Sequence, residues 1–355
     1  MKRVLVCFVL LWQVTFALGD PLPPLPSNNS SVEVPTQEWP YEPGPRKVTV
    51  YLHYPGGELV NVNENTGLML SLHNWGGTHA RGTADPDLLT NKYNVIAICV
   101  DYIQSGDWKE TGKPYDFGMY QAIDALRALH YVYSSLQETE TPFNKGRIYS
   151  CGGSGGGNVT LMCTKFAPRT FACVIDMSGM ARLSDDIAYG EEGGSRLDAG
   201  YSRDPNDPFY LTPAAQEFRD IGNPNHLSAM KDLGCTTHII ISHGASDEVC
   251  PATDARKMAA NIQASGLSTE SHFIEEKDFE GKTFTNTGHS VGDRTLIAQH
   301  FGDPYLLPDS EQRMVREGPN DFDLRDDKVR YNVRGGEYVV NYGEGAPVLK
   351  LETKQ

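Results

Sequence analysis

The chain has 355 residues, a length that fits one large or two modest domains. Its composition, with 39% hydrophobic and 22% charged residues, is typical of a soluble globular protein. Its formal net charge is −15. Phosphate backbones repel such an acidic chain, which argues against a nucleic acid as its partner. Polyanionic substrates are disfavoured for the same reason, unless a local basic pocket binds them.

The first segment of the chain has the pattern of a secretory signal peptide. Lys2 and Arg3 precede an apolar run, and Ala17 and Gly19 supply the small residues of a cleavage site after Gly19. The alternative is a membrane anchor, but the run is short for a membrane span. We expect residues 1–19 to be removed, which predicts a secreted or periplasmic protein with no transmembrane segment. Losing two basic residues takes the net charge to −17.

The rest of the chain alternates between predicted strands and helices. Residues 20–46 are rich in Pro, Ser and Asn, and we expect an extended, poorly ordered leader with glycosylation sequons in NNSS. The later alternation predicts a mostly parallel sheet with helices on both faces. Strands are expected at 47–54, 67–73, 93–102, 146–153, 171–179, 236–244 and 270–276, and helices over about 116–136, 158–166 and 253–265.

Two segments depart from this alternation. Residues 180–235 are polar and rich in Gly, Asp and Pro, and they fall between two core strands, so we predict an insert that caps the sheet. This divides the chain into a core domain over 47–305 and a C-terminal extension over 306–355. In the extension, VRYNVRGGEYVVNYG predicts a hairpin that turns at Gly335-Gly336.

Six cysteines remain once Cys7 leaves with the signal peptide. A secreted location permits disulfides. Cys99 and Cys173 nevertheless lie in apolar runs, where cysteine usually packs as a small hydrophobe. No pair has metal-ligand spacing. We expect between zero and two disulfides and no metal, with no pairing assigned among Cys99, Cys151, Cys163, Cys173, Cys235 and Cys250.

The stretch YSCGGSGGGN, residues 149–158, surrounds one serine with glycine. A flexible linker does not fit between two closely flanking apolar runs, and no Lys-Ser or Lys-Thr follows as a phosphate loop requires. A dinucleotide fingerprint would use Gly155, Gly157 and Asp176, but its glycine spacing is only partial. The pattern G-x-S-x-G instead predicts a sharp strand-to-helix turn that presents Ser154 as a nucleophile.

A serine nucleophile of this kind needs an acid and then a histidine further along the chain. Asp247 follows the strand at 236–244, and His289 follows the last strand in a glycine-containing loop. We predict that His289 takes the proton of Ser154 and that Asp247 orients the imidazole. The alternatives are Glu248 or Asp254 for the acid, and His272 or His300 for the base.

The same chemistry needs two N–H donors for the oxyanion. Gly155, which follows the nucleophile, is expected to supply one of them, and the loop HNWGG after an early strand is expected to supply the other. We predict the backbone N–H of Trp75 as the second donor, with Asn74 as the alternative. Asn74 and Trp75 are also the predicted substrate-binding residues, with Trp75 as a pocket wall.

The motifs HNWGG, GGSGGG, HGASDEV and TGHS, in this order, resemble the α/β-hydrolase superfamily. The resemblance covers roughly 47–305 and is nearest to the secreted esterase, prolyl-oligopeptidase-like and dienelactone-hydrolase-like branches. It implies an α/β-hydrolase fold, a Ser154–His289–Asp247 triad and no cofactor. The early loop departs from the usual H-G-x-G pattern, because Asn74 replaces the first glycine.

We therefore expect a secreted serine hydrolase that cleaves a small-molecule, glycan or lipid ester. The first alternative is a prolyl-oligopeptidase-like peptidase, for which Glu191-Glu192 would bind a peptide amino terminus, although such an acidic pair is more often solvated surface. The second is a non-enzymatic binding protein of the same fold. The aromatics of the insert either stack on a sugar or aryl group of the substrate or simply pack: Tyr189, Tyr201, Phe209 and Tyr210.

Overall fold

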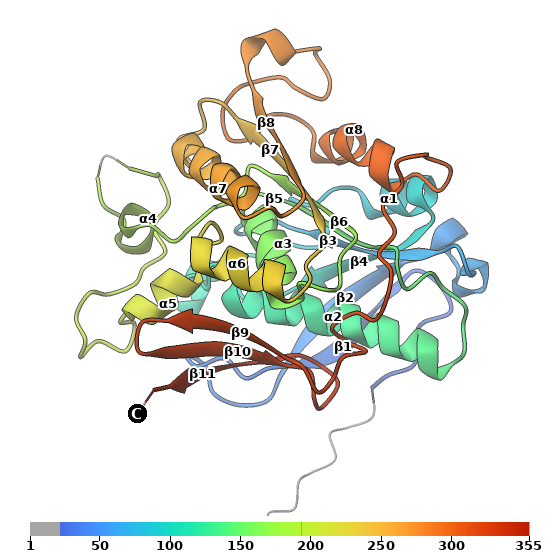
Figure 1. The fold of residues 1–355 in the computed structure, drawn as a ribbon, viewed down its shortest axis with the longest axis horizontal. Coiled ribbons are helices and arrows are strands. Elements are labelled where there is room, and N and C mark those ends of the chain that lie inside the picture. The colour runs from blue at the N-terminus through green and yellow to red at the C-terminus, as the bar shows by residue number, and fades with distance from the viewer. Residues whose placement is uncertain (1–21, 193, 355) are drawn as a thin grey trace, which may run out of the picture.

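The computed structural model describes residues 22–192 and 194–354, so the predicted signal peptide lies outside the described residues. A central sheet has the strand order β1-β2-β4-β3-β5-β6-β7-β8 (Figure 1). The first two strands run antiparallel to their neighbours, and the run from β4 to β8 is parallel. The strands are β1 Ser30–Thr36, β2 Arg46–His53, β3 Gly67–Leu72, β4 Val95–Asp101, β5 Ile148–Gly153, β6 Cys173–Met177, β7 His238–Gly244 and β8 Thr269–Ile274.

Helices cover both faces of this sheet, as its strongly apolar inner strands require. On one face α2 and α3 pack into the larger hydrophobic cluster, and on the other α1 and α8 pack into a second cluster. The α-helices are α1 Pro86–Tyr93, α2 Met119–Glu138, α3 Gly155–Phe166, α4 Asp185–Tyr189, α5 Pro213–Phe218, α6 Pro224–Asp232, α7 Ala252–Ala264 and α8 Arg294–Leu306, and short 3-10 turns occupy Pro55–Gly57, Leu59–Asn61, Trp108–Thr111 and Glu276–Asp278. No helix in the described part of the chain is long and apolar enough to cross a membrane.

The prediction of a poorly ordered leader over 20–46 is wrong for the residues of β1. This strand pairs along its whole length with β2, from Ser30 opposite Leu52 to Thr36 opposite Arg46. Val32 and Val34 alternate with polar residues, and the side chain of Val34 is buried. The Pro- and Asn-rich composition of this segment obscured the alternation that is typical of a strand. Pro35 is tolerated within β1 because β1 is an edge strand.

The C-terminal extension forms a three-stranded antiparallel sheet of β9 Lys328–Val333, β10 Gly336–Asn341 and β11 Val348–Thr353. The turn between β9 and β10 lies at residues 334–335, and the third strand was not predicted. Figure 1 shows this small sheet beside α5, α6 and α2. Asp321 anchors the extension to the core, because its carboxylate accepts 2.7 Å and 2.9 Å hydrogen bonds from the backbone and side chain of Arg169.

The insert over 180–235 supplies α4, α5 and α6, and it packs onto the core rather than forming a separate unit (Figure 1). Lys165, on α3, connects the core to the insert in the interior of the protein. Its ammonium donates to the carbonyl of Phe218 at 2.7 Å and contacts His226 Nδ1 at 2.9 Å. Burial lowers the pKa of Lys165 to about 7, although the charges of Asp220 and Glu217 oppose the shift.

This buried lysine predicts a pH dependence of stability. Between pH 7 and about 10 the unfolded chain binds a proton at Lys165 that the folded chain lacks, so the free energy of unfolding rises with pH through this group. Lys165→Met should remove the effect, flattening the profile by up to about 1.4 kcal/mol per pH unit. Denaturant unfolding at pH 7, 8 and 9 measures it. The control is Lys231→Met, which removes an exposed lysine that also donates to a carbonyl, that of Gly266. Equal slopes for both variants would contradict the assignment.

Candidate active site

Ser154 lies at the turn between β5 and α3 in a strained backbone conformation, with φ 57° and ψ −119°. The turn is sharp because three backbone segments meet there. A Cβ on Gly152 would lie 2.2 Å from the carbonyl oxygen of Gly156, and one on Gly156 would lie 2.3 Å from that of Leu72. Any larger residue at these two positions would push β3, β5 and α3 apart, so the local sequence builds the predicted nucleophile turn.

The structure brings the three predicted triad residues together in one hydrogen-bonded chain. His289 Nε2 lies 2.8 Å from Ser154 Oγ, and His289 Nδ1 lies 2.8 Å from Asp247 Oδ2. Ser154 follows β5, and Asp247 lies in the loop after β7, so both side chains come from the carboxyl edge of the sheet. His289 reaches them from the loop before α8. This is the geometry in which an imidazole accepts a hydroxyl proton while a carboxylate fixes its tautomer.

The alternative acids and bases lie elsewhere. Glu248 is exposed and pairs with Arg196 at 3.3 Å, while Asp254 pairs with Arg182 at 2.9 Å. His272 packs its ring against that of Phe301, with the ring centroids 4.4 Å apart, and His300 packs against Phe301 from α8. None of these residues contacts Ser154 or His289 through a hydrogen bond within the described ranges.

Asp247 is buried, and its carboxylate makes four polar contacts. Its Oδ1 accepts hydrogen bonds from the backbone N–H groups of Val249 and Cys250 at 2.8 Å and 3.0 Å. Its Oδ2 faces His289 and, at 3.3 Å, His243 Nε2. Burial alone would raise the pKa of this carboxyl, but the two imidazoles hold that pKa well below its usual range. Asp247 is therefore a carboxylate at any pH where His289 acts as a base.

Two residues of the site, which lie behind Asp247, were not predicted from the sequence. His243, on β7, belongs to the quoted HGASDEV motif, and it touches Asp247 and donates toward the carbonyl of Cys250 at 2.8 Å. Asp176, on β6, is buried near it, and burial raises its pKa to about 7. A Cβ on Gly157 would lie 2.1 Å from Asp176 Oδ1, so this glycine makes room for the carboxyl. Asp176 thus serves the interior behind the triad and not a nucleotide.

The predicted oxyanion donors also lie side by side. A Cβ on Gly155 would lie 2.6 Å from the backbone nitrogen of Trp75 and 3.1 Å from the hydroxyl of Tyr115. Neither Gly155 N–H nor Trp75 N–H donates a hydrogen bond to any other residue that the structure describes. Both are free to bind a developing negative charge at the start of α3, where the helix dipole adds to the attraction.

Trp75 and Asn74 differ in what their side chains do. The Trp75 ring stacks on that of Tyr115, with centroids 3.7 Å apart and planes 5° apart, and forms a wall beside the donors. The Asn74 side-chain oxygen instead faces Gly77 and Gly82, where it would lie 2.6 Å and 1.7 Å from added Cβ atoms. The amide oxygen of Asn74 thus lies against its own loop, and a substrate-binding role for Asn74 stays a prediction.

Two further side chains near the triad carried no recognisable sequence signal. Arg294, at the start of α8, crosses behind the serine turn, where its Nε would lie 2.4 Å from a Cβ on Gly153. It donates to the carbonyl of Gly82, which ties the loop of Trp75 to the segment that carries His289. Cys250 is buried, with its sulfur within 4.8 Å of the donor atoms of Asp247 and His289. Burial holds its thiol pKa well above the usual range, so it is a poor nucleophile.

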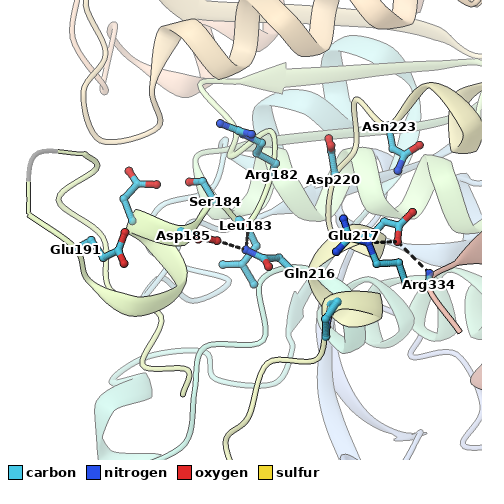
Figure 2. A pocket seen from close by; sticks show the side chains of 12 residues that line it. Arg182, Leu183, Ser184, Asp185, Glu191, Gln216, Glu217, Asp220, Asn223 and Arg334 are labelled. Atoms are coloured by element: carbon cyan, nitrogen blue, oxygen red, sulfur yellow. Dashed lines mark hydrogen bonds and ion pairs between the residues drawn. The ribbon is translucent and has the colours of Figure 1, made fainter. Parts of the chain in front are cut away.

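The six cysteines in the described part of the chain are all buried and unpaired, so no disulfide forms among them. A separate pocket of about 680 Å³ lies along the insert. The guanidinium groups of Arg182 and Arg334 line it together with acidic and neutral side chains (Figure 2), and its acidic residues are Asp185, Asp186, Glu191, Glu217 and Asp220. The triad does not line it. Glu191 in this pocket pairs with Arg203 at 2.5 Å, as expected for a surface ion pair rather than a free anionic site.

Comparisons with known proteins agree with this architecture. Residues 106–317, more than half of the chain, match a family described as a protein of unknown function (DUF2920). The chain belongs to this family. No curated protein matches the chain. The family's matched region begins before α2 and ends after α8, so it includes Ser154, Asp247 and His289.

Solved structures resemble the chain at low sequence identity. The acylaminoacyl peptidase of Pyrococcus horikoshii has a TM-score of 0.54 and 12% identity, over 80% of this chain and 43% of that one. A puromycin-hydrolyzing peptidase of Mycobacterium tuberculosis has a TM-score of 0.53 and 15% identity, over 83% and 42%. The chain thus spans less than half the length of these proteins. The likeness confirms the predicted α/β-hydrolase fold.

Gly155 offers a direct test of the oxyanion site. Gly155→Ala places a methyl group against the nitrogen of Trp75, where the oxyanion would bind. The rate of Ser154 labelling by a fluorophosphonate should fall by about 10²-fold or more, as for loss of one oxyanion donor. Gly343→Ala, whose added Cβ would have the Asn341 side chain at 3.2 Å as its nearest neighbour, is the control and should label at the normal rate. A normally reactive, folded Gly155→Ala protein would contradict the assignment.

His243 is predicted to position the triad acid. His243→Asn removes an imidazole that faces Asp247, and loss of such a buried charge-assisted contact is worth about 1.5–3 kcal/mol, or roughly 10- to 150-fold in labelling rate. The pH profile of labelling should also shift, which a purely structural defect would not cause. His238→Asn is the matched control on the same strand, since His238 bonds Ser268 at 2.8 Å away from the triad. An unshifted profile for His243→Asn would refute the role.

Proposed function

We propose that this protein is a serine hydrolase that cleaves a carboxylic ester through an acyl-enzyme on Ser154. The observation that carries the proposal is the hydrogen-bonded chain from Ser154 through His289 to Asp247, with 2.8 Å at each step. Serine, imidazole and carboxylate in this order are the groups that nucleophilic acyl transfer needs. The strained turn and the two unoccupied N–H donors add the parts that the same reaction requires.

The steps follow from this geometry. His289 Nε2 removes the proton of Ser154 as Oγ attacks the ester carbonyl, and the N–H groups of Gly155 and Trp75 bind the resulting oxyanion. Asp247 stabilises the imidazolium. His289 then returns the proton to the departing alcohol, which leaves the acyl group on Ser154. A water molecule, deprotonated by His289 in the same way, releases the acid and restores the hydroxyl.

A peptidase is the second candidate. The similar solved structures are named as peptidases, which supports amide cleavage as much as ester cleavage by the same triad. Esters remain our first choice, because the alkoxide or phenoxide of an ester is a better leaving group than the amine of an amide. The triad can therefore cleave an ester without a further domain that holds the substrate. The third possibility, a binding protein without activity, is disfavoured by the assembled triad. We also propose that the protein is secreted, on the pattern of residues 1–19.

The test is turnover of a short-chain aryl ester by the purified protein, compared with a matched proline anilide. Ser154→Ala should lower ester turnover by about 10³-fold or more. It should also abolish fluorophosphonate labelling. Cys250→Ala is the control that removes the buried thiol next to the triad, and it should keep most of the activity. Faster anilide cleavage would favour the peptidase, and unchanged activity in Ser154→Ala would refute the proposal.

A further inference from the structure

A second pocket, of about 330 Å³, lies between three segments that flank the core of the fold. Its walls come from residues 39–41 of the N-terminal segment, from the insert, and from β10 and β11 of the C-terminal sheet, which Figure 1 shows close to α5. Neither Ser154 nor His289 lines it. Six aromatic side chains surround it: Trp39, Tyr41, Tyr120, Tyr201, Tyr210 and Tyr338.

The polar floor of this pocket has an unsatisfied acceptor. Asp116 is buried, and its Oδ2 accepts a 2.9 Å hydrogen bond from the backbone of Gln121. Its Oδ1 has no hydrogen-bond partner among the residues that the structure describes. Buried carboxylate oxygens are rarely left in this state without a ligand or water. The orphan oxygen and the lining together point to a binding site.

Arg219 supplies the complementary donors. It is buried beside Asp116 and donates to the carbonyls of Asp116 and Ala215 and to the hydroxyl of Tyr201, at 2.9, 2.9 and 3.1 Å. A guanidinium carries five N–H groups, so two remain. Arg219 Nη2 and Asp116 Oδ1 are 4.0 Å apart, too far for a direct hydrogen bond. The two charges therefore pair across the floor of the pocket, but no hydrogen bond joins Asp116 Oδ1 to Arg219.

A hydroxyl group fits this floor better than an ion does. It donates its proton to Asp116 Oδ1 and accepts a hydrogen bond from Arg219 at the same time. An ammonium only donates and would be repelled by Arg219, and a carboxylate only accepts and would be repelled by Asp116. The aromatic walls add flat apolar surfaces, which suit a ring with C–H faces. The volume is at the small end of the range for ligand pockets.

We propose that this pocket binds one neutral pyranose ring of a saccharide, with a ring hydroxyl between Asp116 and Arg219 and the ring faces against tyrosine. The site is separate from the triad, but one turn joins the two. Tyr115 stacks on Trp75 at the oxyanion loop, and Asp116 directly follows it. Phe117, next in the chain, has a positive φ of 55°, so this turn is held in a restricted conformation.

Saturation-transfer NMR with three probes tests the proposal: methyl β-D-glucopyranoside, methyl β-D-galactopyranoside and N-acetylglucosamine. At least one should receive saturation on its ring C–H protons. Ala215→Phe, which fills the pocket from α5, should weaken that binding at least 10-fold, and Asp116→Asn should weaken it by about 10-fold, as for loss of one charged hydrogen bond. Tyr51→Ala, an aromatic residue outside the pocket, should bind normally.

Two further probes test whether the pocket prefers another class of ligand. Choline and 4-hydroxybenzyl alcohol represent a cation and a planar aromatic alcohol, and tighter binding of either would overturn the saccharide assignment. Transfer to none of the three sugars, or transfer that Ala215→Phe leaves unchanged, would do so as well. Ser154→Ala should bind the sugar as the unaltered protein does, so the result is independent of the proposed hydrolase activity. Circular dichroism of each variant confirms that it is folded.

Discussion

The close backbone contact among β3, β5 and the start of α3 is the constraint on which the site depends. It forces Ser154 into a positive φ, which costs on the order of 1–3 kcal/mol in a non-glycine residue. Every residue of β5 and α3 is buried, so the packing of these elements holds the strained turn in place. The same contact directs the hydroxyl outward and leaves the N–H of Gly155 free beside that of Trp75.

Two buried carboxyls near this turn show how partners, rather than burial alone, set protonation. Asp176 and Asp247 are both almost fully buried. Burial raises the pKa of Asp176 to about 7, since no side chain within the described ranges bonds to its oxygens. Asp247 has two imidazoles and two backbone N–H donors, and these reverse the effect of burial. Hydrogen bonds to the charged form thus separate a permanent carboxylate from a group that titrates near neutrality.

The sequence predicted what depends on local pattern and chain order. The period-two and apolar runs located the core strands, and the long helix expected over 116–136 is Met119–Glu138. The order of Ser154, Asp247 and His289 predicted the residues that meet. The error at 30–36 arises from a contact with another segment. Pairing with β2, rather than the composition of this segment, determines that 30–36 is a strand. The position of the Asn74 side chain against Gly82 likewise depends on how its loop folds. Neither contact leaves a signal in the residues themselves.

The segments outside the core explain why α3 can be buried on all sides. A helix at the surface of a sheet normally exposes one polar face, yet α3 exposes none. The C-terminal sheet covers the end of this helix, where Tyr331 and Tyr342 donate to the carbonyls of Lys165 and Phe166. These carbonyls belong to the last turn of the helix and have no partner within it. The extension thus satisfies the far end of the helix whose first turn carries the nucleophile, and the helix is fixed at both ends.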